Sequence, residues 1–143
     1  MAANSIFLDA NGWFALLNED DTLHKVASDL WLEVGERRNP WVFLTDWIIA
    51  ETGNGLARTP ARKRFADGVR RLRGWPRVRL IEVTPELRER ALELYSDRPD
   101  KTWGLVDCVS FLVMSEHDIF DAFTTDHHFE QAGFTCLLPV SAL

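Results

Sequence analysis

Four acidic residues stand in or beside apolar runs, where an unpaired carboxylate is costly. Asp9 follows Ile-Phe-Leu, Glu51 follows Ile-Ile-Ala, and Asp107 stands between Leu-Val and Cys-Val. Asp126 follows the short run Ala-Phe-Thr by two residues. No lysine or arginine lies within three residues of the first three acids. Buried carboxylates must be paired, protonated or metal-bound, so the pattern favours Mg²⁺ or Mn²⁺, which take oxygen ligands.

Each acid taken alone also has an ordinary structural explanation. A carboxylate in the first turn of a helix compensates the helix dipole, which suits Asp107 and Glu51. A carboxylate at the end of a strand is often only a turn residue, which suits Asp9. The sequence leaves these alternatives open for any single acid.

Other residue types offer weaker chemistry. Cys108 and Cys136 have neither a disulfide framework nor a zinc-ligand spacing, and Cys108 is expected to pack as a small apolar side chain. His127 and His128 are adjacent, so on a helix their side chains point about 100° apart and make poor joint ligands. The sequence therefore predicts no histidine or cysteine metal site.

Apolar strand-like runs alternate with helical patterns along the chain. Strands are expected at 6–8, 41–44, 78–83, 122–124 and 134–138. Helices are expected after Asp21, after a cap at Thr45 or Asp46, after caps at Thr59 and Thr84, and over 105–114 and 127–132. This alternation predicts an α/β fold: one domain over residues 1–143, a three-layer α/β/α sandwich with a mainly parallel five-stranded sheet.

The expected elements bring the four acids to one edge of that sheet. Asp9 ends the first strand and Asp126 follows the fourth, while Glu51 and Asp107 lie in early turns of helices. Parallel sheets place their ligand sites outside the carboxyl ends of the strands, where the strand order reverses. Four carboxylates from four separate segments are therefore expected to converge.

The residues around these acids form four motifs in a fixed order. They read Ile-Phe-Leu-Asp9-Ala-Asn11-Gly-Trp13, Ile-Ile-Ala-Glu51-Thr, Leu105-Val-Asp107-Cys-Val-Ser110-Phe111 and Phe123-Thr124-Thr-Asp126-His-His-Phe129. In this order and spacing, from about Ile6 to Leu138, the chain resembles the PIN domain. Within that family it is most similar to the VapC-type ribonuclease toxins of bacterial toxin–antitoxin pairs.

The resemblance implies endonucleolytic cleavage of RNA that depends on Mg²⁺, with Mn²⁺ as a possible substitute. It assigns both metal binding and catalysis to the quartet Asp9, Glu51, Asp107 and Asp126. It gives supporting positions to Asn11, Asp100 and Thr124. Metal held by the quartet would polarise a phosphodiester oxygen and lower the pKa of a bound water, without a serine or cysteine nucleophile.

One position departs from the family pattern. Relatives often carry serine where Gly104 stands, three residues before Asp107, and serine there would complete a capping box. Glycine is tolerated at a helix cap but offers no side-chain bond. We therefore expect Asp107 to be held less tightly than in relatives with serine.

The charges of the chain are segregated. The net charge is −6, yet the stretch from 58 to 79 holds nine basic residues and one acid, so it carries +8 and the other 121 residues carry −14. A basic surface of this kind suits a polyanion, although a solvated helix face is an equally plain explanation. The residues expected to contact RNA phosphates are Arg58, Arg62, Lys63 and Arg64.

The resemblance also implies a cognate antitoxin protein as partner and a homodimer. The chain has no apolar run of membrane-spanning length and begins without a positively charged leader, so a cytoplasmic protein is expected. Two other functions remain open: a PIN-like RNA-binding or scaffold module without activity, and a phosphoryl-transfer domain such as a phosphatase or receiver. The phosphoryl-transfer alternative is disfavoured because no lysine follows Asp126 and no second aspartate accompanies Asp9.

Overall fold

The computed structural model describes residues 4–140, so both ends of the expected domain, 1–3 and 141–143, lie outside the described residues. Five strands form one sheet in the order β3-β2-β1-β4-β5, and every neighbouring pair is parallel. The strands are β1 (Ser5–Leu8), β2 (Trp41–Thr45), β3 (Val78–Ile81), β4 (Asp121–Phe123) and β5 (Thr135–Cys136). The expected parallel five-stranded sheet is confirmed.

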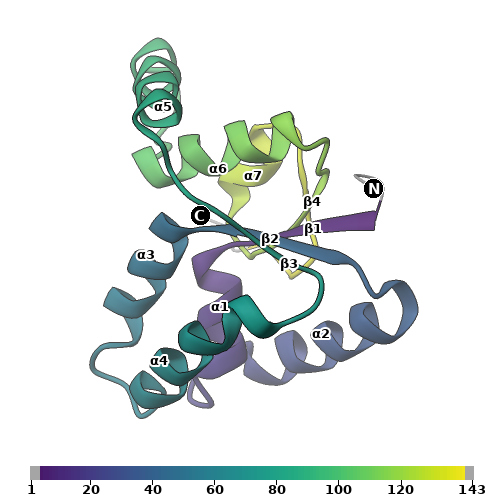
Figure 1. Cartoon of the computed structure of the whole chain (residues 1–143). Helices are drawn as coiled ribbons and strands as arrows, with labels where there is room; N and C mark the ends of the chain where they lie inside the picture. Colours follow the sequence, from purple (N-terminus) through teal and green to yellow (C-terminus); the bar gives the residue numbers. More distant parts are fainter. Residues whose placement is uncertain (1–3, 141–143) are drawn as a thin grey trace.

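Helices cover both faces of the sheet, which gives the three layers visible in Figure 1. The layer below the sheet in that view contains α1 (Ala10–Leu17), α2 (His24–Arg38), α3 (Asp46–Leu56) and α4 (Arg62–Arg71). The layer above contains α5 (Pro85–Asp97), α6 (Leu105–Glu116) and α7 (His127–Gln131). The three-layer α/β/α sandwich is therefore confirmed.

Apolar side chains explain why these elements pack as they do. β1 is buried along its whole length, as a central strand covered on both faces should be. α6 buries six of its twelve residues, in agreement with an apolar pattern that runs nearly around the helix. Phe111 of α6 packs edge-on against Phe129 of α7, with ring centroids 5.0 Å apart. The core thus joins the two segments that carry Asp107 and Asp126.

The sequence missed one helix and misplaced the start of another. α1 begins directly after β1, although its residues show no clear polar face and include Gly12, a weak helix former. α4 was expected to begin at the Thr59 cap but begins at Arg62, because the Thr59 hydroxyl accepts from the Ala61 amide within a preceding turn. Thr45 and Thr84 do cap α3 and α5 as expected.

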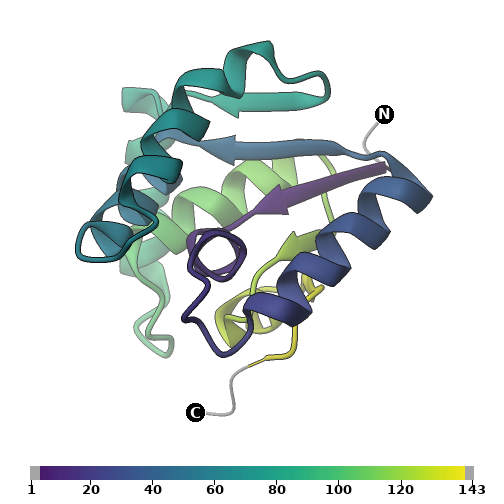
Figure 2. The same ribbon diagram turned by 90° about the horizontal axis from the view of Figure 1, so that it is seen from below.

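The strand order reverses beside β1, which lies between β2 and β4 (Figure 2). From β1 the chain adds β2 and β3 on one side, then returns to add β4 and β5 on the other. The crevice at the carboxyl ends of β1 and β4 is therefore the expected ligand position of this fold. Among residues 4–140, no helix is long and apolar enough to span a membrane.

Candidate metal-binding active site

The pairing of β1 with β4 places Asp9 beside Thr124. Leu8 stands opposite Phe123 in the parallel ladder, so the next residues of the two strands emerge together at the switch point. The Thr124 hydroxyl lies 2.7 Å from Asp9 Oδ2, and both residues are buried. The register of β1 against β4 thus brings Asp9 and Thr124, which are more than a hundred residues apart in the sequence, into contact.

Asn11 completes a hydrogen-bond array with these two residues. Its Oδ1 accepts from the Thr125 amide at 3.1 Å and lies 2.7 Å from the Thr124 hydroxyl, which itself accepts from the Asp126 amide. Thr124 has one hydroxyl proton but two oxygen acceptors at 2.7 Å. The Thr124 hydroxyl therefore lies between the Asp9 carboxylate and the Asn11 amide oxygen and donates its proton to one of them at a time. The contacts agree with the supporting positions expected for Asn11 and Thr124.

Gly12 allows α1 to approach β4 this closely. A Cβ atom at Gly12 would lie 2.1 Å from the backbone oxygen of Phe123, far inside any normal contact. The glycine is therefore needed for steric reasons, although the sequence analysis gave it no role. It fixes the distance between the helix that carries Asn11 and the strand that leads to Thr124.

Asp107 lies in the first turn of α6, and its carboxylate caps that helix. Its Oδ2 accepts from the backbone amide of Gly104 at 3.0 Å. A capping box consists of two reciprocal hydrogen bonds, and this one runs from the backbone amide of the cap residue to the side chain three residues later, so it needs no side chain at the cap. Gly104 therefore removes one bond of the box but keeps the one that orients Asp107, and the expectation of a loosely held carboxylate is not supported.

Asp126 is held in a similar way at the start of α7. Its Oδ1 accepts from the backbone amide of His128 at 2.9 Å, so one carboxylate oxygen caps the helix. Glu51 lies on α3, one turn beyond the Thr45 cap, and is the most exposed of the four acids. Separate structural elements thus supply the four carboxylates.

The charges of the four carboxylates act on one another. The pKa of Asp9 is raised to about 7, mainly by burial and in smaller part by the charges of Asp107 and Glu51, against the opposing effect of the Thr124 hydrogen bond. The pKa of Glu51 is raised by burial and then by Asp107 and Asp126. Burial and Asp126 likewise raise the pKa of Asp107. Among residues 4–140, no lysine or arginine forms an ion pair with any of the four.

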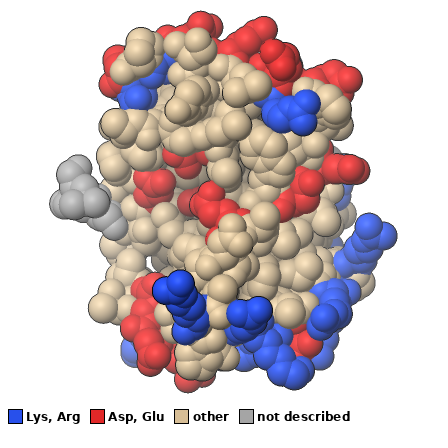
Figure 3. Space-filling model, turned by 90° about the vertical axis from the view of Figure 1, so that its left-hand side faces the viewer, with Lys and Arg blue, Asp and Glu red and all other residues tan. Residues whose placement is uncertain are grey.

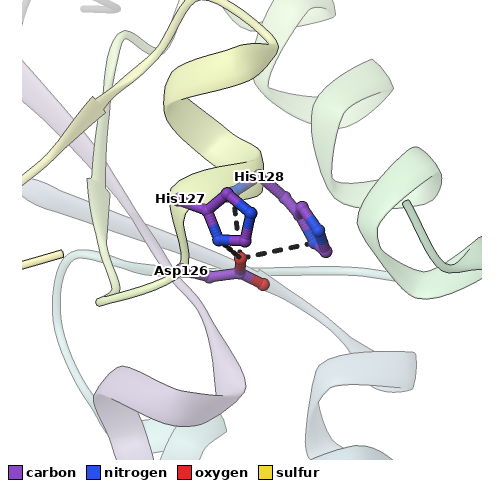
Figure 4. Close-up of side chains that lie close together, drawn as sticks. All are labelled: Asp126, His127 and His128. Atoms are coloured by element: carbon purple, nitrogen blue, oxygen red, sulfur yellow. Dashed lines mark hydrogen bonds and ion pairs between the residues drawn. The ribbon is translucent and has the colours of Figure 1, made fainter. Parts of the chain in front are cut away.

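A histidine also enters this cluster, which the sequence analysis did not expect. His128 Nδ1 lies 3.3 Å from Asp107 Oδ2. It also lies 3.3 Å from Asp126 Oδ1 (Figure 4). Suitable ligand atoms of Asp126, His127 and His128 all lie within 4.8 Å of one another. The expectation that the adjacent rings diverge is wrong here, because their centroids lie 4.4 Å apart and ligand atoms of both histidines lie close to Asp126.

The PIN domain family model matches residues 6–135. The chain belongs to the PIN domain family. It is 32% identical over 134 residues to the 23S rRNA-specific endonuclease VapC20 in two strains of Mycobacterium tuberculosis, covering 94% of this chain and 98% of the relative.

Solved structures agree with this membership. The crystal structure of Mycobacterium tuberculosis VapC20, described as a sarcin-ricin loop cleaving toxin, matches with a TM-score of 0.79 and 32% identity. That match covers 91% of this chain and 96% of the solved one. FitAcB from Neisseria gonorrhoeae shares the fold at a TM-score of 0.62 and 21% identity, covering 94% and 97%. The expected PIN-like fold is confirmed.

One acid predicted for this PIN site makes its contacts elsewhere. Asp100 forms two hydrogen bonds of 3.0 Å with the Arg98 guanidinium and lies 3.8 Å from Lys101 Nζ. The neighbouring guanidinium lowers the pKa of Asp100, whereas the pKa values of Asp9, Glu51 and Asp107 are raised. The contacts of Asp100 therefore give no support to its expected place beside the quartet.

The basic stretch of the PIN domain includes α4. Figure 3 shows acidic side chains near the middle of one face of the molecule, and lysine and arginine along the lower part of that face, toward α4. Some of these cations have partners: Lys63 pairs with Asp67 at 2.8 Å, and Arg64 with Glu19 at 3.4 Å. Because these ion pairs are exposed, they hold the cations only weakly.

Other polar and apolar features of the PIN domain lie apart from this chemistry. Burial raises the pKa of the Cys108 thiol to about 11, so this side chain is an inert core residue, as expected. A cavity of about 420 Å³ is lined by apolar residues of α1, α2, α4 and the sheet, including Trp31 and Phe65. None of the four acids lines it.

Proposed function

We propose that this protein is a divalent-metal-dependent endoribonuclease and the toxin of a toxin–antitoxin pair. The observation that carries the proposal is that the charges of Asp9, Glu51, Asp107 and Asp126 act on one another near the switch point of the sheet, while no lysine or arginine among residues 4–140 forms an ion pair with them. Homology to an endonuclease over nearly the whole chain supports the same activity.

The residues present fit Mg²⁺ or Mn²⁺. The helix-capping hydrogen bonds fix the carboxylates of Asp107 and Asp126, and the oxygens of each carboxylate keep lone pairs that can bind a cation. Asp9 and Asp107 would hold the metal, and Glu51 and Asp126 would complete its surroundings. When bound, such an ion supplies Lewis-acid polarisation of the phosphodiester and a water of lowered pKa.

The chain's own side chains have separate tasks in this reaction. Thr124 and Asn11 orient Asp9, because their hydrogen bonds hold its carboxyl at the edge of the crevice. Glu51, the most exposed acid, is placed to accept the proton of the attacking water, and its raised pKa makes it a better base than an ordinary glutamate. Hydrolysis by this route needs no covalent intermediate with the protein.

The substrate proposed is RNA, held by its phosphates against the basic stretch. Arg58, Arg62, Lys63 and Arg64 would neutralise phosphates below the acidic crevice, where Figure 3 shows lysine and arginine gathered. Ribosomal RNA is the first target to test, since the relative VapC20 is named for cleavage of 23S rRNA. A cytoplasmic location, a homodimer and an antitoxin partner are part of the same proposal.

Cleavage of a 23S rRNA fragment with and without EDTA tests the proposal. We expect internal cuts in Mg²⁺ or Mn²⁺, none after EDTA treatment, and recovery when the metal is restored. Binding of RNA without cleavage under all of these conditions would contradict the proposal and favour a module that only binds RNA. The control is the Asp126→Asn variant, which keeps the oxygen that caps α7 but removes the charge.

A further inference from the structure

The ring of His128 is inserted between two of the four carboxylates. Its Nδ1 lies 3.3 Å from an oxygen of Asp107 and 3.3 Å from an oxygen of Asp126, and its side chain is 17% exposed. Nδ1 itself is buried, yet it has no hydrogen-bond partner among the described residues. A buried polar atom without a partner calls for an explanation.

The other ring nitrogen determines how the ring is held. His128 Nε2 lies 3.1 Å from the Thr102 hydroxyl, a normal hydrogen-bond distance. When Nε2 donates to Thr102, the Nδ1 lone pair faces the carboxylates, as it does in a histidine that binds a metal through one nitrogen and is fixed through the other.

The adjacent histidine differs in this respect. His127 Nδ1 lies 3.7 Å from Asp126 Oδ1, and the His127 side chain is 33% exposed. The two rings are 4.4 Å apart and lie side by side in Figure 4. His127 is therefore a matched control: the same residue type, one position away, beside one carboxylate instead of between two.

We propose that His128 is a nitrogen ligand of the catalytic metal, together with Asp107 and Asp126, and that it makes the site favour Mn²⁺ over Mg²⁺. Mg²⁺ is a hard ion that binds oxygen, whereas imidazole suits transition metals. One nitrogen among carboxylates therefore shifts the preference without excluding Mg²⁺. The inference rests on the proposed function, since it requires a divalent ion at the four acids.

Electron spin echo envelope modulation of bound Mn²⁺ tests the direct bond. The full chain is loaded with Mn²⁺ alone, and the wild type is compared with His128→Gln and His127→Gln. We expect a ¹⁴N coupling in the wild type and in His127→Gln, its replacement by a ¹⁵N coupling after ¹⁵N-histidine labelling, and its loss in His128→Gln. Circular dichroism of each variant checks that the fold is kept.

Titration calorimetry with Mn²⁺ and with Mg²⁺ tests the preference. His128→Gln should weaken Mn²⁺ binding by at least about tenfold, the lower end of the effect seen when residues that support metal ligands are lost, and should change Mg²⁺ binding much less. Mn²⁺ binding with no ¹⁴N coupling, or a coupling that persists in His128→Gln, would overturn this inference alone. No binding of either ion would overturn the proposed function as well.

Discussion

Replacing Asp9 with asparagine should stabilise the metal-free protein while abolishing cleavage. Burial holds the pKa of Asp9 at about 7, against 3.8 for an ordinary aspartate. At a pH between these two pKa values, Asp9 keeps its proton in the native state but loses it in the unfolded chain. The unfolding free energy of the wild type therefore falls as the pH rises from about 4 to about 7. A difference of about 3 pKa units between the native and unfolded states lowers the unfolding free energy by at most about 4 kcal/mol at pH 7.5. Asparagine avoids this cost because it carries no charge, and it keeps a side-chain oxygen that can accept from the Thr124 hydroxyl.

Urea unfolding in EDTA at pH 4.5 and pH 7.5 measures this effect. Asp9→Asn should exceed the wild type in unfolding free energy by up to about 4 kcal/mol at pH 7.5, and the gap should narrow toward pH 4.5. Asp100→Asn is the matched control, because Arg98 lowers the pKa of that exposed carboxyl and its removal offers no relief. An Asp9→Asn variant no more stable than the wild type at pH 7.5, or a gap independent of pH, would refute the reasoning.

Three further predictions concern packing, RNA and metal. Gly12→Ala should lower the unfolding free energy by roughly 1–3 kcal/mol and reduce cleavage, because the new Cβ would lie 2.1 Å from the Phe123 backbone oxygen. Urea unfolding checks this, and an unchanged urea midpoint of unfolding would contradict it. Replacing Arg62, Lys63 and Arg64 with alanine should reduce the slope of log binding constant against log salt concentration by up to about three units, as measured by fluorescence anisotropy with RNA. An unchanged slope would mean that these side chains form a solvated helix face and do not contact RNA. At 10 mM Mg²⁺ and a Kd of about 1 mM, metal binding should raise the unfolding free energy by about 1.4 kcal/mol and the melting temperature by about 3–6 °C. NaCl of equal ionic strength should not reproduce this rise in melting temperature.

The sequence was sufficient to predict the positions of the four acids. Asp9 and Asp126 follow apolar strands, and in a parallel sheet the carboxyl ends of neighbouring strands share one edge. The register of β1 against β4 could not be predicted, because it depends on side-chain packing between distant segments. The array of Thr124 with Asp9 and Asn11 therefore became visible only in the structure.

Two residues show what local reasoning omits. His128 was set aside because adjacent histidines diverge, yet a single histidine at the start of a short helix can turn toward Asp107 on another element. Asp100 was expected to support the quartet, although Arg98, two residues before it, offers a closer and opposite charge. The charge of Arg98 beside Asp100 was visible in the sequence. The contact of His128 with Asp107 depends on the packing of α6 against α7, which the sequence does not show.

Single-turnover cleavage of one RNA by isosteric variants tests the central claim most directly. Asp9→Asn, Glu51→Gln, Asp107→Asn and Asp126→Asn each remove one charge from the site, and Asp100→Asn makes the same change outside it. If the four carboxylates form one metal-dependent nuclease site, each of the first four variants loses cleavage in Mg²⁺ and Mn²⁺ while Asp100→Asn cleaves at the wild-type rate. Wild-type cleavage by any two of the four variants would contradict the claim.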